Sequence, residues 1–127
     1  MVTADDFGQN PHINRAVVQA YREGFLTCAS LMVTGPFAGE AVALARQNPG
    51  LRVGLHLVLV DGTSVLPHRE IPRLVDHARR FAVRPSAVGR RYFPNPETNR
   101  QLAAECEAQV KAFLETGLVP DHLNSHH

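Results

Sequence analysis

The chain carries few of the features that mark a membrane, secreted or disulfide-bonded protein. It has only two cysteines, and both Cys28, in an apolar run, and Cys106, on a predicted helix, are expected to be buried free thiols. No uninterrupted apolar stretch approaches the ~20 residues of a membrane span. The N-terminus lacks a basic segment followed by an apolar one, so no signal peptide is predicted. Together these absences predict a cytoplasmic protein without a membrane span.

The charge of the chain gives no sign of a polyanionic partner. The formal net charge is +1, and Lys and Arg are scattered along the sequence. The densest basic stretch, residues 79–91, has a single aromatic side chain, Phe81, before Tyr92, so it is interpreted as a solvated loop. The sequence therefore predicts no nucleic-acid partner.

What the sequence does contain is an alternation of short apolar runs and helical patterns. Hydrophobic residues make up 44% of the chain and charged residues 20%, as in ordinary globular domains. Residues 63–96 are the least regular part, with one helix predicted around residues 71–80. Elsewhere strands are predicted over residues 1–4, 25–33, 51–60 and 118–125, and helices over residues 11–23, 41–48 and 97–116, the last with an apolar stripe of Leu102, Cys106, Val110, Phe113 and Leu114.

This order predicts an α/β fold in which parallel βα units are joined by right-handed crossovers. A closed (β/α) barrel needs roughly 250 residues and eight strands. Residues 1–127 are therefore predicted to form a single, incomplete domain, the N-terminal half of such a barrel. Its open sheet edge is expected to be covered by a homo-oligomer or by the remainder of a longer chain, or else by residues 63–96 folding back.

Polar clusters stand at the ends of three predicted strands. Asp5 and Asp6 follow the first strand, His56 lies in the third, and residues 124–127 (Asn-Ser-His-His) close the fourth. In parallel α/β folds the carboxyl ends of the strands share one face, so these clusters are expected to converge. One carboxylate and two imidazoles are a common ligand set for a divalent ion.

Each cluster also has a simpler interpretation. Adjacent aspartates often form a helix cap or polar turn, a histidine in an apolar strand is often a core residue, and a terminal His–His pair can be the stub of an affinity tag. Taken together at successive strand ends, they favour a metal site. One aspartate could bind the ion while the other accepts a proton, because successive residues normally project in different directions; the spacing leaves open which does which.

Four segments closely resemble the YdjC-like deacetylases, a family that includes chitooligosaccharide deacetylase. They are VTADDFG (2–8), TCASLMVTGP (27–36), VGLHLVLVDG (53–62) and DHLNSHH (121–127), in order and at family-like spacing. Residues 91–118 look most like the hopanoid-biosynthesis-associated branch. The resemblance implies a deformed (β/α) barrel that uses a divalent metal ion, Mg²⁺ or Zn²⁺, to remove acetyl groups from N-acetylated sugars such as N-acetylglucosamine-containing oligosaccharides or glycolipids.

The resemblance also implies roles for individual residues. Asp5 of the ADD motif would be the catalytic general base. The metal ligands would be Asp6, His56 of GLHL and His126, the first histidine of NSHH.

The end of the fourth strand departs from the family pattern. The family more often has Asp where Asn124 stands, which bears on the support of His126. Asn124, Ser125 and His127 would lie behind the ligands or against the substrate. The family also continues beyond residue 127, where the resemblance implies a histidine as general acid.

Two other functions remain open from the sequence. One is a barrel metalloenzyme of another class, such as a sugar isomerase. The other is a truncated βα domain that serves binding or assembly without catalysis.

Overall fold

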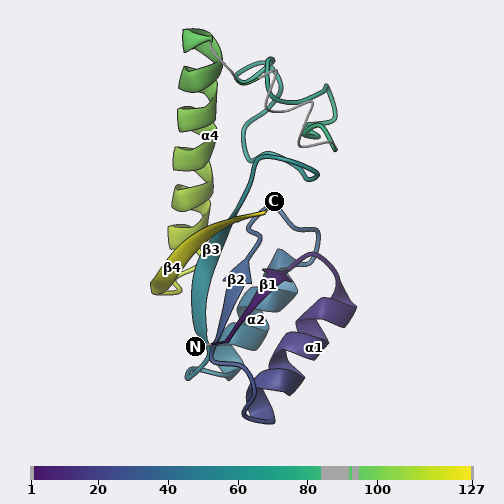
Figure 1. Ribbon diagram of the computed structural model, residues 1–127, viewed down its shortest axis with the longest axis vertical. Helices are drawn as coiled ribbons and strands as arrows, with labels where there is room; N and C mark the ends of the chain where they lie inside the picture. The colour runs from purple at the N-terminus through teal and green to yellow at the C-terminus, as the bar shows by residue number, and fades with distance from the viewer. Residues whose placement is uncertain (1, 84–91, 93–94, 127) are drawn as a thin grey trace.

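Strands and helices alternate along the chain in the computed structural model, which describes residues 2–83, 92 and 95–126 (Figure 1). This alternation confirms the predicted α/β class. The strands are β1 (Thr3–Phe7), β2 (Cys28–Leu31), β3 (Arg52–Val58) and β4 (Pro120–His126), and the helices are α1 (Pro11–Arg22), α2 (Ala38–Gln47) and α4 (Pro96–Glu115).

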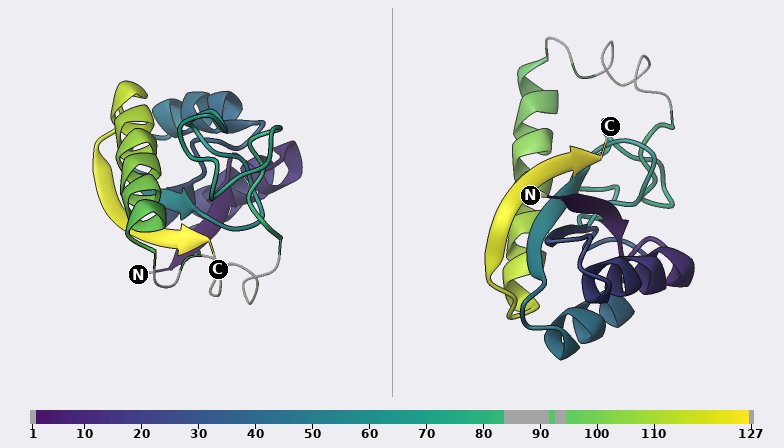
Figure 2. Two further views of the ribbon diagram at one scale, coloured as in Figure 1. Left: turned by 90° about the horizontal axis from the view of Figure 1, so that it is seen from above. Right: turned by 60° about the horizontal axis from the view of Figure 1, so that its bottom comes forward.

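The four strands form one parallel sheet in the order β1-β2-β3-β4. Parallel neighbours need crossover connections, and seen from above α4, α2 and α1 follow one another along one side of the sheet (Figure 2). A core of buried apolar side chains, among them Leu31, Leu55 and Phe113, fills the space between helices and sheet. The opposite face of the sheet is thereby left for polar side chains, as in part of a (β/α) barrel.

Helix α1 begins where the sequence predicts. The Asn10 side chain accepts hydrogen bonds from the backbone N–H groups of His12 (3.0 Å) and Ile13 (2.9 Å), and Pro11 occupies the first turn. Gly24 follows the helix with a φ of 84°, a conformation that L side chains rarely adopt. Helix α1 therefore has the cap and the terminator that its sequence predicts.

The helix predicted around residues 71–80 does not form. This segment makes turns and takes part in two isolated antiparallel bridges, Thr63 with Arg80 and Val75 with Phe81. The Asp76 carboxylate accepts hydrogen bonds from the backbone N–H groups of Ala78 (2.9 Å) and Arg80 (2.8 Å). Such local side-chain bonds compete with helix formation, so the prediction is wrong here.

The apolar stripe predicted on α4 is also wrong in large part. Phe113 is buried, but Val110 and Leu114 are 38% and 54% exposed. The buried face of α4 instead carries polar side chains at intervals of three and four residues, namely Thr98, Gln101, Glu105 and Gln109.

This polar face bonds to backbone groups at the end of β3 and in the segment that follows it. Gln109 accepts from the Val58 N–H (3.0 Å) and donates to the Val58 carbonyl (2.8 Å). The Glu105 carboxylate accepts from the N–H groups of Val65 (2.8 Å) and Leu66 (3.0 Å). Helix α4 thus satisfies backbone groups of Val58, at the end of β3, and of the segment that follows, which apolar side chains could not do.

The outer edge of the sheet is apolar and exposed in the described part of the chain. Val119, just before β4, and Leu123, within it, are 85% and 59% exposed. A shallow hollow of about 180 Å³, lined in part by Leu55, Leu114 and Leu123, lies between β4 and α4. Coverage of this edge by a second copy or by further chain stays a prediction.

No helix among the described residues is both long enough and apolar enough to cross a membrane. The cytoplasmic location stays a prediction.

Candidate metal centre

The carboxyl ends of three strands bring Asp6, His56 and His126 together. Asp6 Oδ1 lies 3.3 Å from His56 Nε2 and 2.9 Å from His126 Nδ1, and the two ring nitrogens lie 3.3 Å apart. Both imidazoles are buried, at 2% and 7% exposure, and they meet edge to face. We refer to these three residues as the Asp–His–His group.

The backbone of β1 turns two successive aspartates toward the same imidazole. Asp6 has a φ of 61°, and the pairing of β1 with β2 shifts register between Ala4 and Phe7. As a result Asp5 Oδ1 lies 3.8 Å from His56 Nδ1, while Asp6 Oδ1 lies 3.3 Å from His56 Nε2. An L residue in this left-handed region is strained, and such strain is typical of functional positions. The strand also continues through both aspartates, whereas the sequence predicted its end at Ala4.

The donor atoms of this group fit a divalent ion. Asp6 Oδ1 is buried, and although it lies 2.9 Å from His126 Nδ1 it accepts no properly oriented hydrogen bond from the residues that the structure describes. An orphaned buried carboxylate oxygen is costly unless a cation compensates it. Ligands at about 2.0–2.1 Å from Zn²⁺ or Mg²⁺ stand about 3.0–3.4 Å apart, close to the separations found here.

Asn124 connects Asp5 to His56. Its amide nitrogen donates to Asp5 Oδ1 (2.8 Å), and its oxygen lies 2.7 Å from His56 Nδ1. Because the carboxylate can only accept, the amide oxygen faces His56, whose Nδ1–H is then the donor. This bond leaves the lone pair of Nε2 directed at the Asp–His–His group, as metal-binding histidines require.

The Asp5 carboxyl is held in its ionised form. Partial burial raises its pKa, but hydrogen bonds from Asn124 and Ser30 lower it. The imidazoles of His56 and His122 act in the same direction, and the resulting pKa lies below the ordinary value of 3.8. Asp5 is therefore an ionised carboxylate, about half exposed, beside the Asp–His–His group.

The remaining predicted site residues are placed differently. Ser125 is exposed and alternates with its neighbours along β4, so its side chain lies on the face opposite Asn124 and His126. The structure thus does not bring it to the group. His127 lies outside the described residues.

A second set of potential ligands lies on the same face of the sheet, nearer the beginning of the strands. Cys28, Asp121 and His122 each offer an atom within 4.8 Å of the others, and we refer to them as the Cys–Asp–His group. All three have protein partners: Cys28 Sγ lies 2.9 Å from Thr3 Oγ1, and His122 lies between Asp121 (3.0 Å) and Ser30 (2.9 Å). This group is a hydrogen-bonded network.

The sequence contains a pattern that places His122 on the same face of β4 as Asn124 and His126, although His122 was not among the predicted site residues. His122, Asn124 and His126 alternate along β4, and the period of two puts all three on one face. Ser30 carries no comparable signal, because it lies within a short strand whose four residues are all buried.

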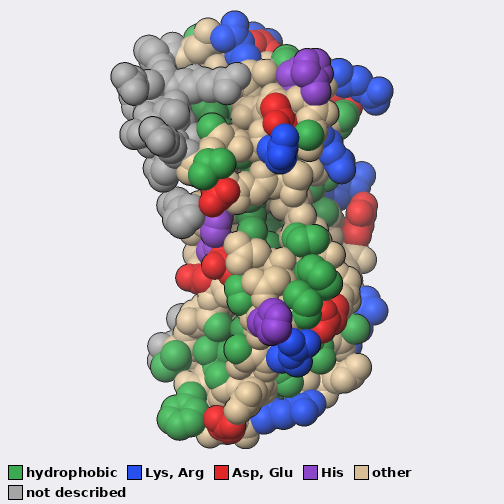
Figure 3. All heavy atoms as spheres, turned by 90° about the vertical axis from the view of Figure 1, so that its right-hand side faces the viewer, with side chains coloured by type: hydrophobic (Ala, Val, Ile, Leu, Met, Phe, Trp, Pro, Cys, Tyr) green, Lys and Arg blue, Asp and Glu red, His purple; other side chains and the backbone are tan. Residues whose placement is uncertain are grey.

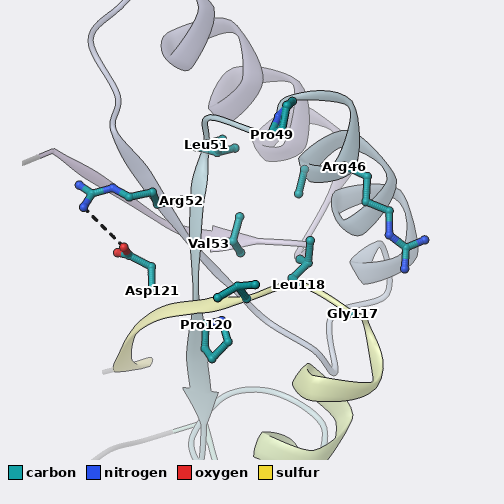
Figure 4. Close-up of a pocket in the computed structure, with 11 residues that line it drawn as sticks. Arg46, Pro49, Leu51, Arg52, Val53, Gly117, Leu118, Pro120 and Asp121 are labelled. Atoms are coloured by element: carbon teal, nitrogen blue, oxygen red, sulfur yellow. Dashed lines mark ion pairs between the residues drawn. The ribbon is translucent and has the colours of Figure 1, made fainter.

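The cluster of histidine and acidic side chains and the larger hollow occupy different parts of the molecule. On the face drawn in Figure 3, histidine and acidic side chains gather at mid-height. A hollow of about 400 Å³ lies at the other end of the strands, where Arg46, Leu51, Val53 and Leu118 are among the lining residues (Figure 4). Its one ion pair, between Arg52 and Asp121, is long at 3.5 Å and partly exposed. It presents no converging donor atoms comparable to the Asp–His–His group in the described chain.

Similarity to known proteins extends over the whole chain. The family model described as YdjC-like protein matches residues 1–127. Relatives named carbohydrate deacetylase include those of Geobacillus stearothermophilus and Brevibacillus brevis, 38% and 39% identical; each match covers 100% of this chain and 48% of the relative. The carbohydrate deacetylase of Vibrio cholerae is 36% identical, with 98% of this chain and 46% of the relative covered.

A solved structure has the same fold. It is the crystal structure of a candidate cellobiose-phosphate cleavage protein of Enterococcus faecalis, which superposes with a TM-score of 0.88 at 32% identity. The match covers 100% of this chain and 48% of that one, as expected of a partial barrel. The chain thus spans about half the length of the relatives it matches.

Proposed function

This chain belongs to the YdjC-like protein family, and from that membership we propose that it carries the metal-binding part of a carbohydrate deacetylase. The reaction is hydrolysis of the acetamide of an N-acetylated sugar, such as an N-acetylglucosamine-containing oligosaccharide or glycolipid. The observation that carries the proposal is the convergence of Asp6 Oδ1, His56 Nε2 and His126 Nδ1 beside the ionised carboxylate of Asp5. Relatives named carbohydrate deacetylase supply the substrate class.

Asp6, His56 and His126 would hold one divalent ion, Mg²⁺ or Zn²⁺. When bound there, the ion supplies Lewis-acid chemistry to an acetamide carbonyl and acidifies a nearby water molecule. Two imidazoles and one carboxylate leave coordination positions open for these oxygen atoms. Asn124 keeps the Nε2 lone pair of His56 available by accepting from its Nδ1–H.

Asp5 is the proposed general base. Its lowered pKa makes it a weak base that is fully ionised at neutral pH, so the water that it deprotonates must already be acidified. Asn124 occupies Asp5 Oδ1, which leaves the other carboxylate oxygen to accept the proton. The water oxygen then forms a bond to the acetyl carbon, the C–N bond breaks, and acetate leaves.

The amine that leaves needs a proton as the C–N bond breaks. We expect this general acid beyond residue 127, because the matched relatives are about twice as long as this chain. The described residues around the Asp–His–His group are proposed as metal ligands, as the base or as their hydrogen-bond partners, and none of them as this acid.

Acetate release tests the proposal directly. The full-length protein, supplied with Mg²⁺ or Zn²⁺, is incubated with N-acetylglucosamine oligosaccharides and with an N-acetylglucosamine glycolipid, and acetate is quantified. We expect acetate from at least one of them and none after chelation. Cellobiose phosphate is a parallel substrate, because of the name of the structural relative. Glucose release without acetate release would contradict the proposal, and isomerisation of a sugar without acetate release would favour the isomerase alternative.

A further inference from the structure

The Asn14 side chain, on α1, joins the loop that follows β1 to the loop that follows β2. Asn14 is completely buried. Its Oδ1 accepts a hydrogen bond from the Gly8 N–H (2.8 Å), and its Nδ2 donates to the Phe37 carbonyl (3.2 Å). The Gly8 carbonyl in turn accepts from the Phe37 N–H (2.9 Å). Gly8 and Phe37 are therefore connected twice, once directly and once through the Asn14 amide.

The backbones of the two loops are in direct contact at this point. Gly8 has a φ of 100°, and a Cβ atom there would lie 3.1 Å from the Met32 carbonyl oxygen. A Cβ atom at Gly35 would overlap the Gly8 carbonyl oxygen. The Phe7 carbonyl accepts from the Met32 N–H (2.8 Å). This contact therefore fixes the backbone on the C-terminal side of Asp6.

Asp6 begins the turn that this contact holds. Its carbonyl accepts from the Gln9 N–H (3.0 Å), which closes a four-residue turn over residues 6–9. Asp6 has a φ of 61°, a conformation that an L residue keeps only where the surrounding structure holds it. The Phe7 and Gly8 carbonyls bond to the loop after β2, whereas the buried Gly8 N–H bonds to Asn14. Without the Asn14 amide that N–H would be buried and unpaired, and a turn rearranged to satisfy it would no longer hold Asp6.

We propose that Asn14 is a positioning residue: through the Gly8 N–H it holds the turn in which Asp6 directs Oδ1 into the Asp–His–His group. The inference rests on the proposed function, in which Asp6 is a metal ligand. Asp6 Oδ1 lies 3.3 Å and 2.9 Å from nitrogen atoms of the two imidazoles. Ligands of one Zn²⁺ or Mg²⁺ ion stand about 3.0–3.4 Å apart, so a small rotation of this turn removes Oδ1 from the set.

Metal affinity in two matched variants tests the inference. In the full-length protein, N14A should raise the Kd for Zn²⁺ by at least about 10-fold, as loss of support for a metal ligand does. The control is N48A. Asn48 is also buried, and its side chain accepts from Arg22 Nε–H (3.1 Å) and donates to the Leu44 carbonyl (2.7 Å), near the start of β3. N48A should lower stability to urea and leave the Kd within about twofold of wild type. A Kd unchanged in both variants, or raised equally in both, would overturn the inference.

Crystal structures of metal-free protein measure the positioning itself and need no activity. Asp6 should keep its positive φ in wild type and in N14D, whose carboxylate can still accept from the Gly8 N–H, and should lose it in N14A. If wild-type protein releases no acetate from any N-acetyl sugar, the proposed function fails while this comparison still tests the role of Asn14. An unchanged Asp6 conformation in N14A would overturn the inference whatever the activity.

Hydrogen exchange in the wild-type protein keeps the test decisive if N14A folds poorly. Coupling between two sites is reciprocal, so an ion bound at Asp6 should also stabilise the bond between Gly8 and Asn14. Zn²⁺ should therefore slow exchange of the Gly8 N–H at least about 10-fold more than that of the Leu51 N–H, which bonds to the Asn48 carbonyl (2.9 Å). Equal slowing at the two amides would contradict the coupling.

Discussion

The Asp–His–His group and the Cys–Asp–His group lie on the same face of the sheet, and each brings three potential ligand atoms within 4.8 Å of one another. They differ in what those atoms already bind. In the first group the buried Asp6 Oδ1 accepts no properly oriented hydrogen bond from the described residues. In the second, Cys28, Asp121 and His122 are satisfied by Thr3, Arg52 and Ser30. Proximity of ligand residues is therefore a weaker sign of a metal site than a buried carboxylate oxygen that accepts no hydrogen bond.

Loss of a ligand should produce the largest difference between the groups. H56A removes one of two imidazoles from the Asp–His–His group, and we expect the metal Kd to rise by at least about 100-fold. C28S changes the Cys–Asp–His group conservatively and should leave metal stoichiometry and Kd unchanged. Isothermal titration with Zn²⁺ measures both. Loss of metal in C28S with retention in H56A would reverse the assignment of the two groups.

Loss of the proposed base should affect rate and spare the metal. D5N keeps the shape of the side chain and removes its charge, so kcat for acetate release should fall by about 10²-fold or more. The metal Kd should stay within a few-fold of wild type, whereas D6N should weaken metal binding. Equal loss of metal in D5N and D6N would show that the two aspartates do not divide these roles.

Asn124 allows a finer separation of metal binding from catalysis. N124A removes the acceptor for His56 Nδ1–H, and the metal Kd should rise about 10-fold. N124D restores an acceptor for His56 but cannot donate to Asp5 when ionised. Its metal affinity should therefore recover while its rate stays low. Parallel recovery of affinity and rate in N124D would show that the donation to Asp5 is dispensable.

The smallest expected effect is the acid sensitivity that Asp5 confers on stability. Its pKa is lower in the folded protein than its ordinary value of 3.8, so the ionised group stabilises the fold above about pH 3.8. This contribution is lost as the pH falls through the lower folded value. It should be less than about 1 kcal/mol, because the side chain is 53% exposed and screened by solvent.

Urea unfolding of metal-free wild type and D5N between pH 3 and pH 6 measures this contribution. The difference in their free energies of unfolding should shrink at the acid end. A difference that does not vary with pH would contradict the account of Asp5.

Sequence periodicity predicted the elements that depend on neighbouring residues. It failed where backbone groups distant in the sequence determine which face of a helix is buried. The strands, α1 and its Asn10 cap follow from apolar spacing and capping chemistry. The polar face of α4 could not be predicted, because Gln109 and Glu105 are buried by partners 39 to 51 residues away. At Asp76, a hydrogen bond to the residue's own side chain stabilises a turn where a helix was predicted.

The candidate site was predictable as a set of residues but not as a geometry. Strand ends in a parallel sheet predicted that the polar clusters containing Asp6, His56 and His126 would meet, and the family resemblance singled out these three residues as ligands. The positive φ of Asp6, which turns both aspartates to one side, has no sequence signal comparable to a glycine. The close approach of the His122 imidazole to Gly54 on β3 likewise has no signal in the sequence.

A crystal structure of the protein grown with Zn²⁺, with the ion located by anomalous scattering, tests the central claim most directly. The account predicts one ion bound by Asp6 Oδ1, His56 Nε2 and His126 Nδ1 at about 2.0–2.2 Å, with Asp5 outside its coordination. An ion bound by Cys28, Asp121 and His122, with the Asp–His–His group left without metal, would contradict it.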